Sequence, residues 1–363
     1  MQTKVKDKSK EISFRGQNIY VGIDAHLKNW TITAMTENSL QRTFSQDPSA
    51  GALHGYLSRT FPEGNYYSAY EAGFCGFSAH RELERHGIRN IVVNPADIPT
   101  TDKERKQKED RRDSRKIARS LKNGELTGIY VPGKETEELR SLVRYRRTLV
   151  KEISRHKTRV KSMLHCFGIA VPAPLSQASR YWSGKFTMWL GTVGFSTGHG
   201  EMVLQSTLST VTHLRAELLK VNRQLRGLEK KGQYSLAIKL LRSVPGVGLI
   251  VAVTLLSELE AITRFKDLDR LCSFVGLVPR TNSSGEKEKT GRITTRSNNP
   301  IRGVLIEAAW TASRNDPALA QAYLELCKRM QPNNAIIRIA KKLLNRIRYV
   351  MKNEKEYVHS VVQ

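Results

Sequence analysis

The sequence predicts three parts: an α/β N-terminal domain, a long antiparallel helical (coiled-coil) middle, and a mostly α-helical C-terminal domain. Three observations lead to this fold class. Strand-like segments alternate with helical patterns over residues 19–133, behind a polar, basic tail at residues 1–18. Coiled-coil-like apolar spacing dominates residues 134–232. Residues 233–363 contain helical patterns around a proline-glycine turn.

The N-terminal domain begins with a predicted β-hairpin, because residues 19–36 show an apolar strand, a polar turn and a second, alternating strand. Further along, we expect a strand, a helix, a strand, a helix and a strand at residues 40–44, 50–59, 65–72, 78–86 and 88–94. This order is typical of an α/β domain that opens with a hairpin.

A helix is predicted over residues 109–124, with Gly124 at its C-terminal end. Asp110 and Asp113 lie three residues apart on one face of this helix, and Ile117 and Leu121 continue that face. Both carboxylates are therefore expected on the side that packs inward. Buried carboxylates need cations.

The middle region is predicted to contain two long amphipathic helices. Apolar residues recur at spacings of three, four and seven over residues 136–167 and again over 208–228, after a connection that contains Pro, Ser and Gly. We expect the two helices to pack antiparallel, with basic outer faces. The cations on these faces are Arg155, Lys157, Arg159, Lys161, Arg223 and Arg226.

The C-terminal region has the pattern helix, PGVG turn, helix around residues 240–259. The turn resembles a helix-hairpin-helix turn, whose backbone N–H groups suit a phosphate, and a plain αα-hairpin turn explains it equally well. A helix at 268–275, a Ser/Gly/Lys-rich loop at 280–299 and two further helices to about residue 352 follow. Asn298, Asn299 and Pro300 are expected to start the helix after the loop.

The net formal charge of +26 and the pI near 10.1 predict a polyanionic partner. No apolar stretch approaches the roughly 20 residues that cross a bilayer, and the charged N-terminus has no apolar core of a secretory signal. We therefore expect a cytoplasmic protein. The four cysteines, Cys75, Cys166, Cys272 and Cys327, are scattered, which indicates buried, reduced thiols and neither disulfides nor a zinc site.

Four acids form the main candidate site: Asp24 closes the first strand, Glu71 ends a later strand, and Asp110 and Asp113 share a helix face. Three or four carboxylates that hold two Mg²⁺ ions are the usual catalyst of phosphodiester chemistry. Mn²⁺ suits oxygen ligands as well. Each acid alone also has an ordinary explanation, as a turn residue, a helix N-terminal carboxylate or a surface ion-pair partner. The neighbouring acids, which spacing alone does not exclude, are Asp97, Asp102, Glu104 and Glu109.

The motifs YVGIDAH, YEAG and KEDRRDSRKIARSL resemble the N-terminal, RuvC/RNase H-like domain of the DEDD transposases of bacterial insertion sequences, whose relatives include the Piv-type DNA invertases. The resemblance implies that Asp24, Glu71, Asp110 and Asp113 take the family's metal-binding, catalytic positions. The usual family pattern is closer to K-T-D-x-x-D-A, whereas this chain has Glu109 and Ser114 at the flanking positions. Neither difference removes a ligand.

The segments around PGVG and SFVGLVPRTNSSGEKEKTGRITTRSNNP resemble the C-terminal transposase domain of the same family. In that family a serine just before a glycine joins to DNA, which implies Ser284, with Ser283 as the adjacent alternative. From chemistry alone Ser-Ser-Gly is an ordinary loop string, because a hydroxyl needs a base or metal to become nucleophilic. The basic residues around it, expected as phosphate contacts, are Lys287, Lys289, Arg292, Arg296 and Arg302.

The resemblance implies an RNA-guided DNA recombinase of an insertion sequence, in the cytoplasm and nucleoid of a bacterium. Its expected partners are donor and target DNA, a structured bridge RNA, and further copies of the chain that form dimers and then a tetramer with a composite site between subunits. Two alternatives remain open from the residues. One is a hydrolytic RuvC-like nuclease with metal-activated water, and the other is a non-catalytic nucleic-acid-binding protein.

Overall fold

A computed structural model describes residues 13–38, 41–99, 110–230, 232–284 and 287–359. The side chains of residues 110, 281–284, 287–290 and 292 lie outside this description, as do most of the expected tail at 1–18 and the acids Asp102, Glu104 and Glu109. The chain divides into two compact units, Met1–Val131 and Pro132–Gln363.

The first unit contains a five-stranded sheet with the order β3-β2-β1-β4-β5. Its strands are β1 (Asn18–Ala25), β2 (Trp30–Thr36), β3 (Gln41–Gln46), β4 (Asn65–Glu71) and β5 (Arg89–Val93). β1, β2 and β3 pair antiparallel, as the predicted hairpin requires, and β1, β4 and β5 pair parallel. The expected hairpin-first α/β order is confirmed.

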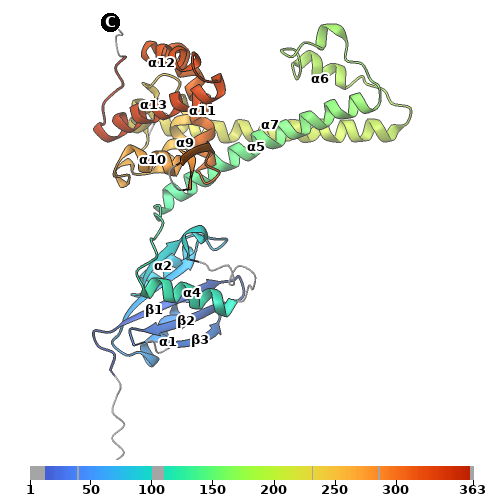
Figure 1. The fold of residues 1–363 in the computed structure, drawn as a ribbon. Helices are drawn as coiled ribbons and strands as arrows, with labels where there is room; N and C mark the ends of the chain where they lie inside the picture. The colour runs from blue at the N-terminus through green and yellow to red at the C-terminus, as the bar shows by residue number, and fades with distance from the viewer. Residues whose placement is uncertain (1–12, 39–40, 100–109, 231, 285–286, 360–363) are drawn as a thin grey trace, which may run out of the picture. The chain divides into compact units, whose positions relative to one another are not determined.

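Helices cover both faces of this sheet (Figure 1). On one face, Ile19, Val21 and Ile23 of β1 form a core with residues of α1 (Ala50–Thr60) and α2 (Ser78–Arg85). On the other face, α4 (Asp110–Lys122) packs against β1 and β2. The alternation of side chains along β1 therefore separates an α1/α2 face from an α4 face.

The second unit begins with two long helices that pack side by side, α5 (Lys134–Cys166) and α7 (Gly198–Lys230). They extend from the C-terminal helices, and the short α6 (Gly184–Leu190) lies at their far end (Figure 1). Two long helices in contact therefore occupy the region where the sequence predicted them. The connection between α5 and α7 contributes apolar and aromatic residues, including the buried Phe186, that form a separate small core with the two helices.

The rest of the second unit is a helical bundle around one large apolar core. Its helices are α8 (Ser235–Arg242), α9 (Leu249–Leu259), α10 (Leu268–Val275), α11 (Asn299–Asn315), α12 (Pro317–Cys327) and α13 (Pro332–Asn353). At the PGVG turn, a Cβ on Gly246 would lie 2.3 Å from the carbonyl oxygen of Ala308 in α11, and Gly246 has φ +84°. The turn thus packs against α11, and both explanations of the PGVG turn remain predictions.

The expected burial of all four cysteines was wrong. Only Cys272 among them is buried, whereas Cys166 is exposed and Cys75 and Cys327 are partly exposed, because spacing along the chain does not specify burial.

Two expectations for the C-terminal region were also wrong. The loop expected at 280–299 forms an antiparallel hairpin, β6 (Pro279–Ser284) and β7 (Lys287–Ile293), because cross-strand pairing is not visible in a Ser/Gly/Lys-rich composition. Three helices follow it, not two. Asp316 caps the N-terminus of α12, and Pro317 has no N–H with which to continue the hydrogen bonding of α11.

No helix in the described part of the chain is long and apolar enough to cross a membrane.

Candidate functional site

Asp24 and Glu71 lie at corresponding ends of two neighbouring parallel strands. Ile23 and Tyr70 form the last pair between β1 and β4. Asp24 directly follows Ile23, and Glu71 directly follows Tyr70. Parallel strands end at the same edge of a sheet, where α/β proteins place their binding residues. Both carboxylates are partly buried. The fold thus brings together two acids that are 47 positions apart in the sequence.

Both acids belong to the face of the sheet that α4 covers. A Cβ on Gly22 would lie 2.0 Å from the carbonyl oxygen of Ser114 in α4, and Asp24 is two residues after Gly22 on the same side of the strand. Glu71 is likewise two residues after Ala69, which packs in one cluster with Ile117 of α4. The helix that carries the remaining two acids therefore packs on the same face of the sheet.

A series of hydrogen-bonded hydroxyl groups connects α4 to the sheet. The Ser114 and Thr33 hydroxyl oxygens are 2.9 Å apart, and Thr33 is also 2.9 Å from the hydroxyl of Thr43 on β3. Ser114 is one of the two residues that depart from the usual family pattern, and its hydroxyl has a buried partner here. Asp113 is its neighbour, so the bond holds the part of α4 that carries this acid against the sheet.

Each of two acids has a cationic or ionisable neighbour. The Asp24 Oδ2 atom is 3.2 Å from His26 Nε2, and the Asp113 Oδ1 atom is 3.3 Å from Lys116 Nζ. The Lys116 side chain is only 11% exposed, and the Asp113 side chain is 26% exposed. His26 and Lys116 are members of the site that the sequence reasoning missed. Lys116 was detectable as the residue at i+3 from Asp113.

The donor set suits Mg²⁺ or Mn²⁺, because carboxylate oxygens are the ligands these ions prefer. Among the described residues, however, no three His, Cys, Asp or Glu side chains are close enough to share one metal ion. The side chain of Asp110 lies outside the described part. Asp110 is the first residue of α4 and therefore one turn before Asp113 and Ser114.

Ser284 is the last residue of β6, and Gly285 lies outside the described residues. The backbone pairs Ser284 with Lys287 and Ser283 with Glu288, so both candidate serines occupy the far end of the hairpin. The side chains of Ser283, Ser284, Lys287, Lys289 and Arg292 are not described. The serine belongs to the second unit and the acids to the first.

An ion pair with a buried carboxylate lies at the base of this hairpin. Glu258 of α9, with a side chain 1% exposed, accepts hydrogen bonds from Arg144 Nε at 2.7 Å and Nη2 at 2.9 Å. Its Oε2 atom also accepts from the Asn298 amide at 2.9 Å. Asn298 caps α11 as expected, and Arg302 donates to the Thr294 carbonyl, which follows β7. These contacts join α5, α9 and α11 where the hairpin ends.

The basic residues of the long helices differ in their surroundings. Arg155 pairs with Glu152 at 2.9 Å, and Arg159 is exposed. Lys161 Nζ lies 3.7 Å from the centre of the Tyr181 ring, and Lys157 Nζ and Arg215 Cζ lie 5.4 Å and 6.0 Å from that of Trp182. Burial, followed by the charges of Arg215 and Lys161, lowers the pKa of Lys157. We call Lys157, Lys161 and Arg215 the tip cations.

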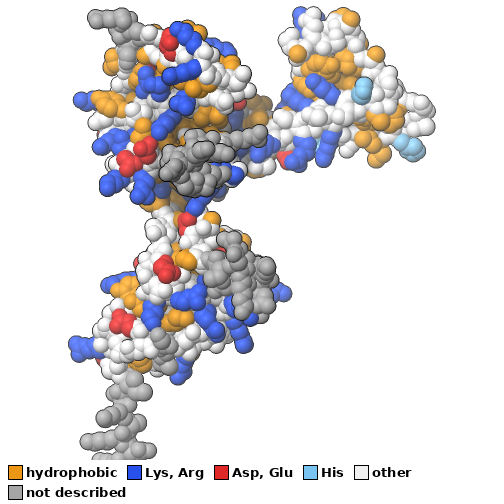
Figure 2. All heavy atoms as spheres, in the orientation of Figure 1, with side chains coloured by type: hydrophobic (Ala, Val, Ile, Leu, Met, Phe, Trp, Pro, Cys, Tyr) orange, Lys and Arg blue, Asp and Glu red, His pale blue; other side chains and the backbone are white. Residues whose placement is uncertain are grey.

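Lys and Arg side chains predominate over acids on the visible face of the molecule (Figure 2). The formal net charge is +26. An excess of this size favours binding to nucleic acid, because each phosphate contact releases condensed counterions.

A hairpin-first sheet with acids at adjacent strand ends, covered by a helix that bears two more, defines a RuvC-like domain of the DEDD type. A family model for the DEDD transposases of the IS110 type, described as "Transposase", matches residues 21–168, and a second, described as "Transposase IS116/IS110/IS902 family", matches residues 238–324. The chain belongs to the IS110 family of transposases. It is therefore a DNA-processing enzyme of DNA transposition.

Similar proteins carry the same description. The chain is 33% identical to "Putative transposase y4qE" of Sinorhizobium fredii over 80% of this chain and 71% of that protein. It is 27% identical to "Putative transposase y4rJ" of the same organism, over 90% of each chain. It is also 25% identical to "Transposase for insertion sequence element IS1533" of Leptospira borgpetersenii, over 81% of this chain and 85% of that one.

Proposed function

We propose that this transposase is an RNA-guided DNA recombinase, which cleaves and exchanges strands through a serine-linked DNA intermediate assisted by ions at the four acids. The observation that carries the proposal is the alignment of Asp24 and Glu71 beside each other at the ends of β1 and β4, on the face that α4 covers. The family membership supports DNA as the substrate. The motif around Ser284 supports the serine as the group that joins to it.

In this proposal Asp24, Glu71, Asp110 and Asp113 hold Mg²⁺ or Mn²⁺. A divalent ion in such a site polarises a phosphoryl oxygen and lowers the pKa of a hydroxyl that attacks it. His26 and Lys116 keep Asp24 and Asp113 oriented at the ends of β1 and α4. Gly22 allows α4 close enough to the sheet for its acids to join those of the strands.

The serine performs a phosphoryl transfer that conserves the number of phosphodiester bonds. The Ser284 oxygen forms a bond to the scissile phosphorus, its proton leaves, and the bond from phosphorus to the neighbouring deoxyribose oxygen breaks. That oxygen takes up a proton. In the second step a deoxyribose hydroxyl of the other DNA attacks the same phosphorus, and the serine leaves with its proton restored. Strands are therefore exchanged without net hydrolysis.

The further partners in this proposal are a structured guide (bridge) RNA, donor and target DNA, and other copies of the chain. The net charge of +26 suits RNA and DNA alike, since both present phosphates. Dimers that assemble into a tetramer bring donor and target together, with the acids of one chain acting beside the serine of another.

The test is a denaturing gel of labelled DNA after reaction with the purified protein and its copurified nucleic acid. We expect a protein-linked DNA band in the presence of Mg²⁺, lost in Ser284→Ala and kept in Ser283→Ala. Asp24→Ala and Asp113→Ala should remove the band and largely keep DNA binding, whereas Asp47→Ala, at an exposed acid outside the site, should change neither.

Other outcomes decide against the proposal. Free cleaved ends without a linked band, unchanged in Ser284→Ala, would establish hydrolysis by a RuvC-like nuclease. Binding without any cleavage would leave a nucleic-acid-binding protein. Full activity of the Asp24 or Asp113 variant would exclude the metal site. Sequencing of the copurified nucleic acid tests the guide, because a guide must pair with both DNA partners.

A further inference from the structure

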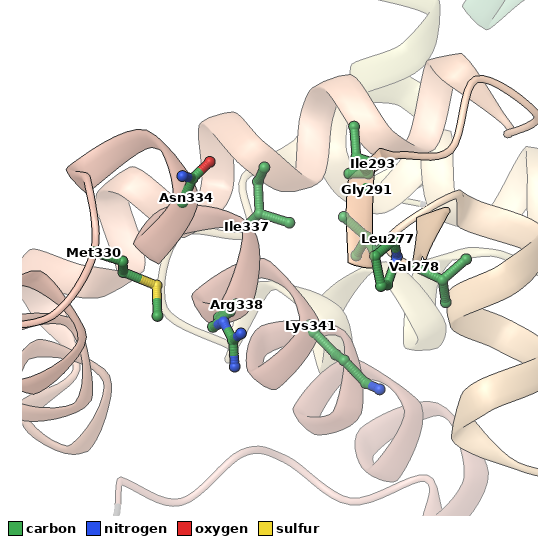
Figure 3. Close-up of a pocket in the computed structure, with 10 residues that line it drawn as sticks. Leu277, Val278, Gly291, Ile293, Met330, Asn334, Ile337, Arg338 and Lys341 are labelled. Atoms are coloured by element: carbon green, nitrogen blue, oxygen red, sulfur yellow. The ribbon is translucent and has the colours of Figure 1, made fainter. Parts of the chain in front are cut away.

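A groove runs along the base of the β6–β7 hairpin, on the side where the hairpin meets α13 (Figure 3). Its volume is about 800 Å³. Leu277, Pro279 and Ile293 line it from the hairpin side, and Met330 and Ile337 line it from the opposite side. Pro279 and Ile293 form the first cross-strand pair of the hairpin, so this wall lies where the hairpin begins.

The polar groups of the groove all come from α13. Asn334, Arg338 and Lys341 follow one another along the helix at steps of four and three residues and line the groove together. Lys341 also pairs with Asp269 at 3.1 Å, whereas Arg338 is exposed and forms no ion pair with any described residue. Among the residues whose side chains the structure describes, no Asp or Glu lines the groove.

This combination matches the chemistry of a nucleotide. Apolar walls suit the face of a base, a side-chain amide can hydrogen-bond to a base edge, and a guanidinium and an ammonium suit the phosphates on either side. An apolar peptide would contact the walls but leave the Arg338 guanidinium without a counter-charge. Charge complementarity therefore favours a nucleic-acid strand as the occupant.

The groove is continuous with the strand that carries the serine. β6 runs from Pro279, in the wall of the groove, to Ser284. Five residue steps of about 3.3 Å give a span of about 17 Å. A stacked DNA strand covers this length in about five nucleotides at 3.4 Å each, and an extended strand covers it in fewer.

We propose that the groove between the hairpin base and α13 binds a nucleobase of the DNA strand that joins to Ser284, within about five nucleotides of the linked phosphate. The inference rests on the proposed function, because it takes Ser284 as the point of attachment. It adds a site for a particular nucleotide beside the point of strand exchange, with Asn334 at the base edge and Arg338 at the phosphate.

The test uses the full-length protein with its copurified nucleic acid and DNA in which 5-iododeoxyuridine replaces one nucleotide at a time on either side of the exchange point. Irradiation should cross-link one position within five nucleotides to the peptide that contains Met330. Arg338→Ala should remove this cross-link and lower the slope of log affinity against log salt by about 1. Lys342→Ala, which removes an equal charge from an exposed position of α13 outside the groove, should keep the cross-link.

A cross-link spread over all positions, or equal in the Arg338 and Lys342 variants, would overturn the inference. A Met330 cross-link found only with iodouridine-substituted RNA would assign the groove to RNA and overturn it as well. Failure of the proposed function is a separate result: the protein-linked band is then missing or unaffected by Ser284→Ala, whatever the cross-link shows. Both Ala substitutions are at exposed positions, and an unchanged Tm confirms that the variants fold.

Discussion

Gly22 of β1 and Ser114 of α4 are in backbone contact, because a Cβ on Gly22 would lie only 2.0 Å from the Ser114 carbonyl oxygen and 2.4 Å from the Ala118 nitrogen. Asp24 follows Gly22 by two residues, and Asp113 precedes Ser114 by one. Because Gly22 has no side chain beyond a hydrogen atom, β1 and α4, which carry these two acids, can approach each other closely.

Gly22→Ala should push α4 away from the sheet. The methyl group meets backbone atoms, which cannot rotate aside, so we expect a loss of about 1–3 kcal/mol in the free energy of unfolding and a large loss of DNA cleavage. Chemical denaturation and the cleavage assay measure the two effects. Gly55→Ala in α1, where nothing lies within 4 Å of the added Cβ, should be neutral or slightly stabilising. Equal behaviour of the two variants would contradict the contact.

Glu258 should make the stability of the second unit depend on acid pH. Burial raises the pKa of Glu258. The hydrogen bonds from Arg144 and Asn298 and the charges of Arg144 and Arg140 lower it by more, so the net pKa is below the ordinary value. Its stabilising contribution is therefore present above the unfolded pKa of about 4.3 and is lost as pH falls through the folded pKa.

The matching variant is Glu258→Gln, which keeps the size of the side chain and removes its charge. We expect a loss of about 1.5–3 kcal/mol near neutral pH, because a hydrogen bond to a charged group has about this strength, and a smaller decrease of Tm in acid. Thermal unfolding at a series of pH values measures both. Glu325→Gln, at a side chain 58% exposed, is the control and should change little. A parallel pH profile for Glu258→Gln and the wild type would refute the prediction.

Tyr357 fastens the C-terminal segment to the bundle. Its hydroxyl donates to Asp316 Oδ2 at 2.5 Å and accepts from Arg346 Nε at 3.1 Å, and Asp316 is fully buried. Burial first, and then the bond to Asp316, raises the pKa of Tyr357. This contribution is fully present below the ordinary tyrosine pKa of about 10 and is lost as pH rises through the folded value.

Tyr357→Phe should destabilise the second unit by about 1–3 kcal/mol, because a buried carboxylate loses a donor. Tyr349→Phe on α13, at a side chain 58% exposed, should be nearly neutral. Denaturant titration at pH 7 compares the two variants, and a second titration above pH 10 should bring Tyr357→Phe and the wild type closer together. No difference at pH 7 would show that the bond to Asp316 contributes nothing.

The tip cations should contribute to nucleic-acid affinity through charge. Lys161→Gln removes one cation from the cluster with Lys157 and Arg215, and we expect the slope of log affinity against log salt to fall by about 1. Lys220→Gln is the matched control, because Lys220 is exposed on α7 and already pairs with Glu217 at 2.6 Å. Fluorescence anisotropy with labelled DNA and RNA measures the slopes. An identical slope for the two variants would remove the tip from the binding surface.

Local patterns in the sequence predicted most of the secondary structure. The alternation at 19–36 and the spacing of apolar residues at 136–167 are properties of single segments, and the structure has β1, β2 and α5 in these places. The positions of Asp24 and Glu71 at strand ends followed from the same patterns. The hairpin at Pro279–Ile293 did not, because its strands are polar and their pairing depends on backbone bonds between residues up to 14 positions apart.

Motifs, periodicity and composition along the chain were enough to predict the family resemblance, the order of strands and helices in the N-terminal domain and the excess of positive charge. Four other features became visible only once the chain was folded. Asp24 and Glu71 are neighbours on the α4 face, and Gly22 allows α4 to pack closely there. Glu258 is buried against Arg144, and a groove lined by Arg338 lies beside the β6–β7 hairpin. These are relations between distant segments. They depend on strand register and helix packing, which the burial of the whole core selects.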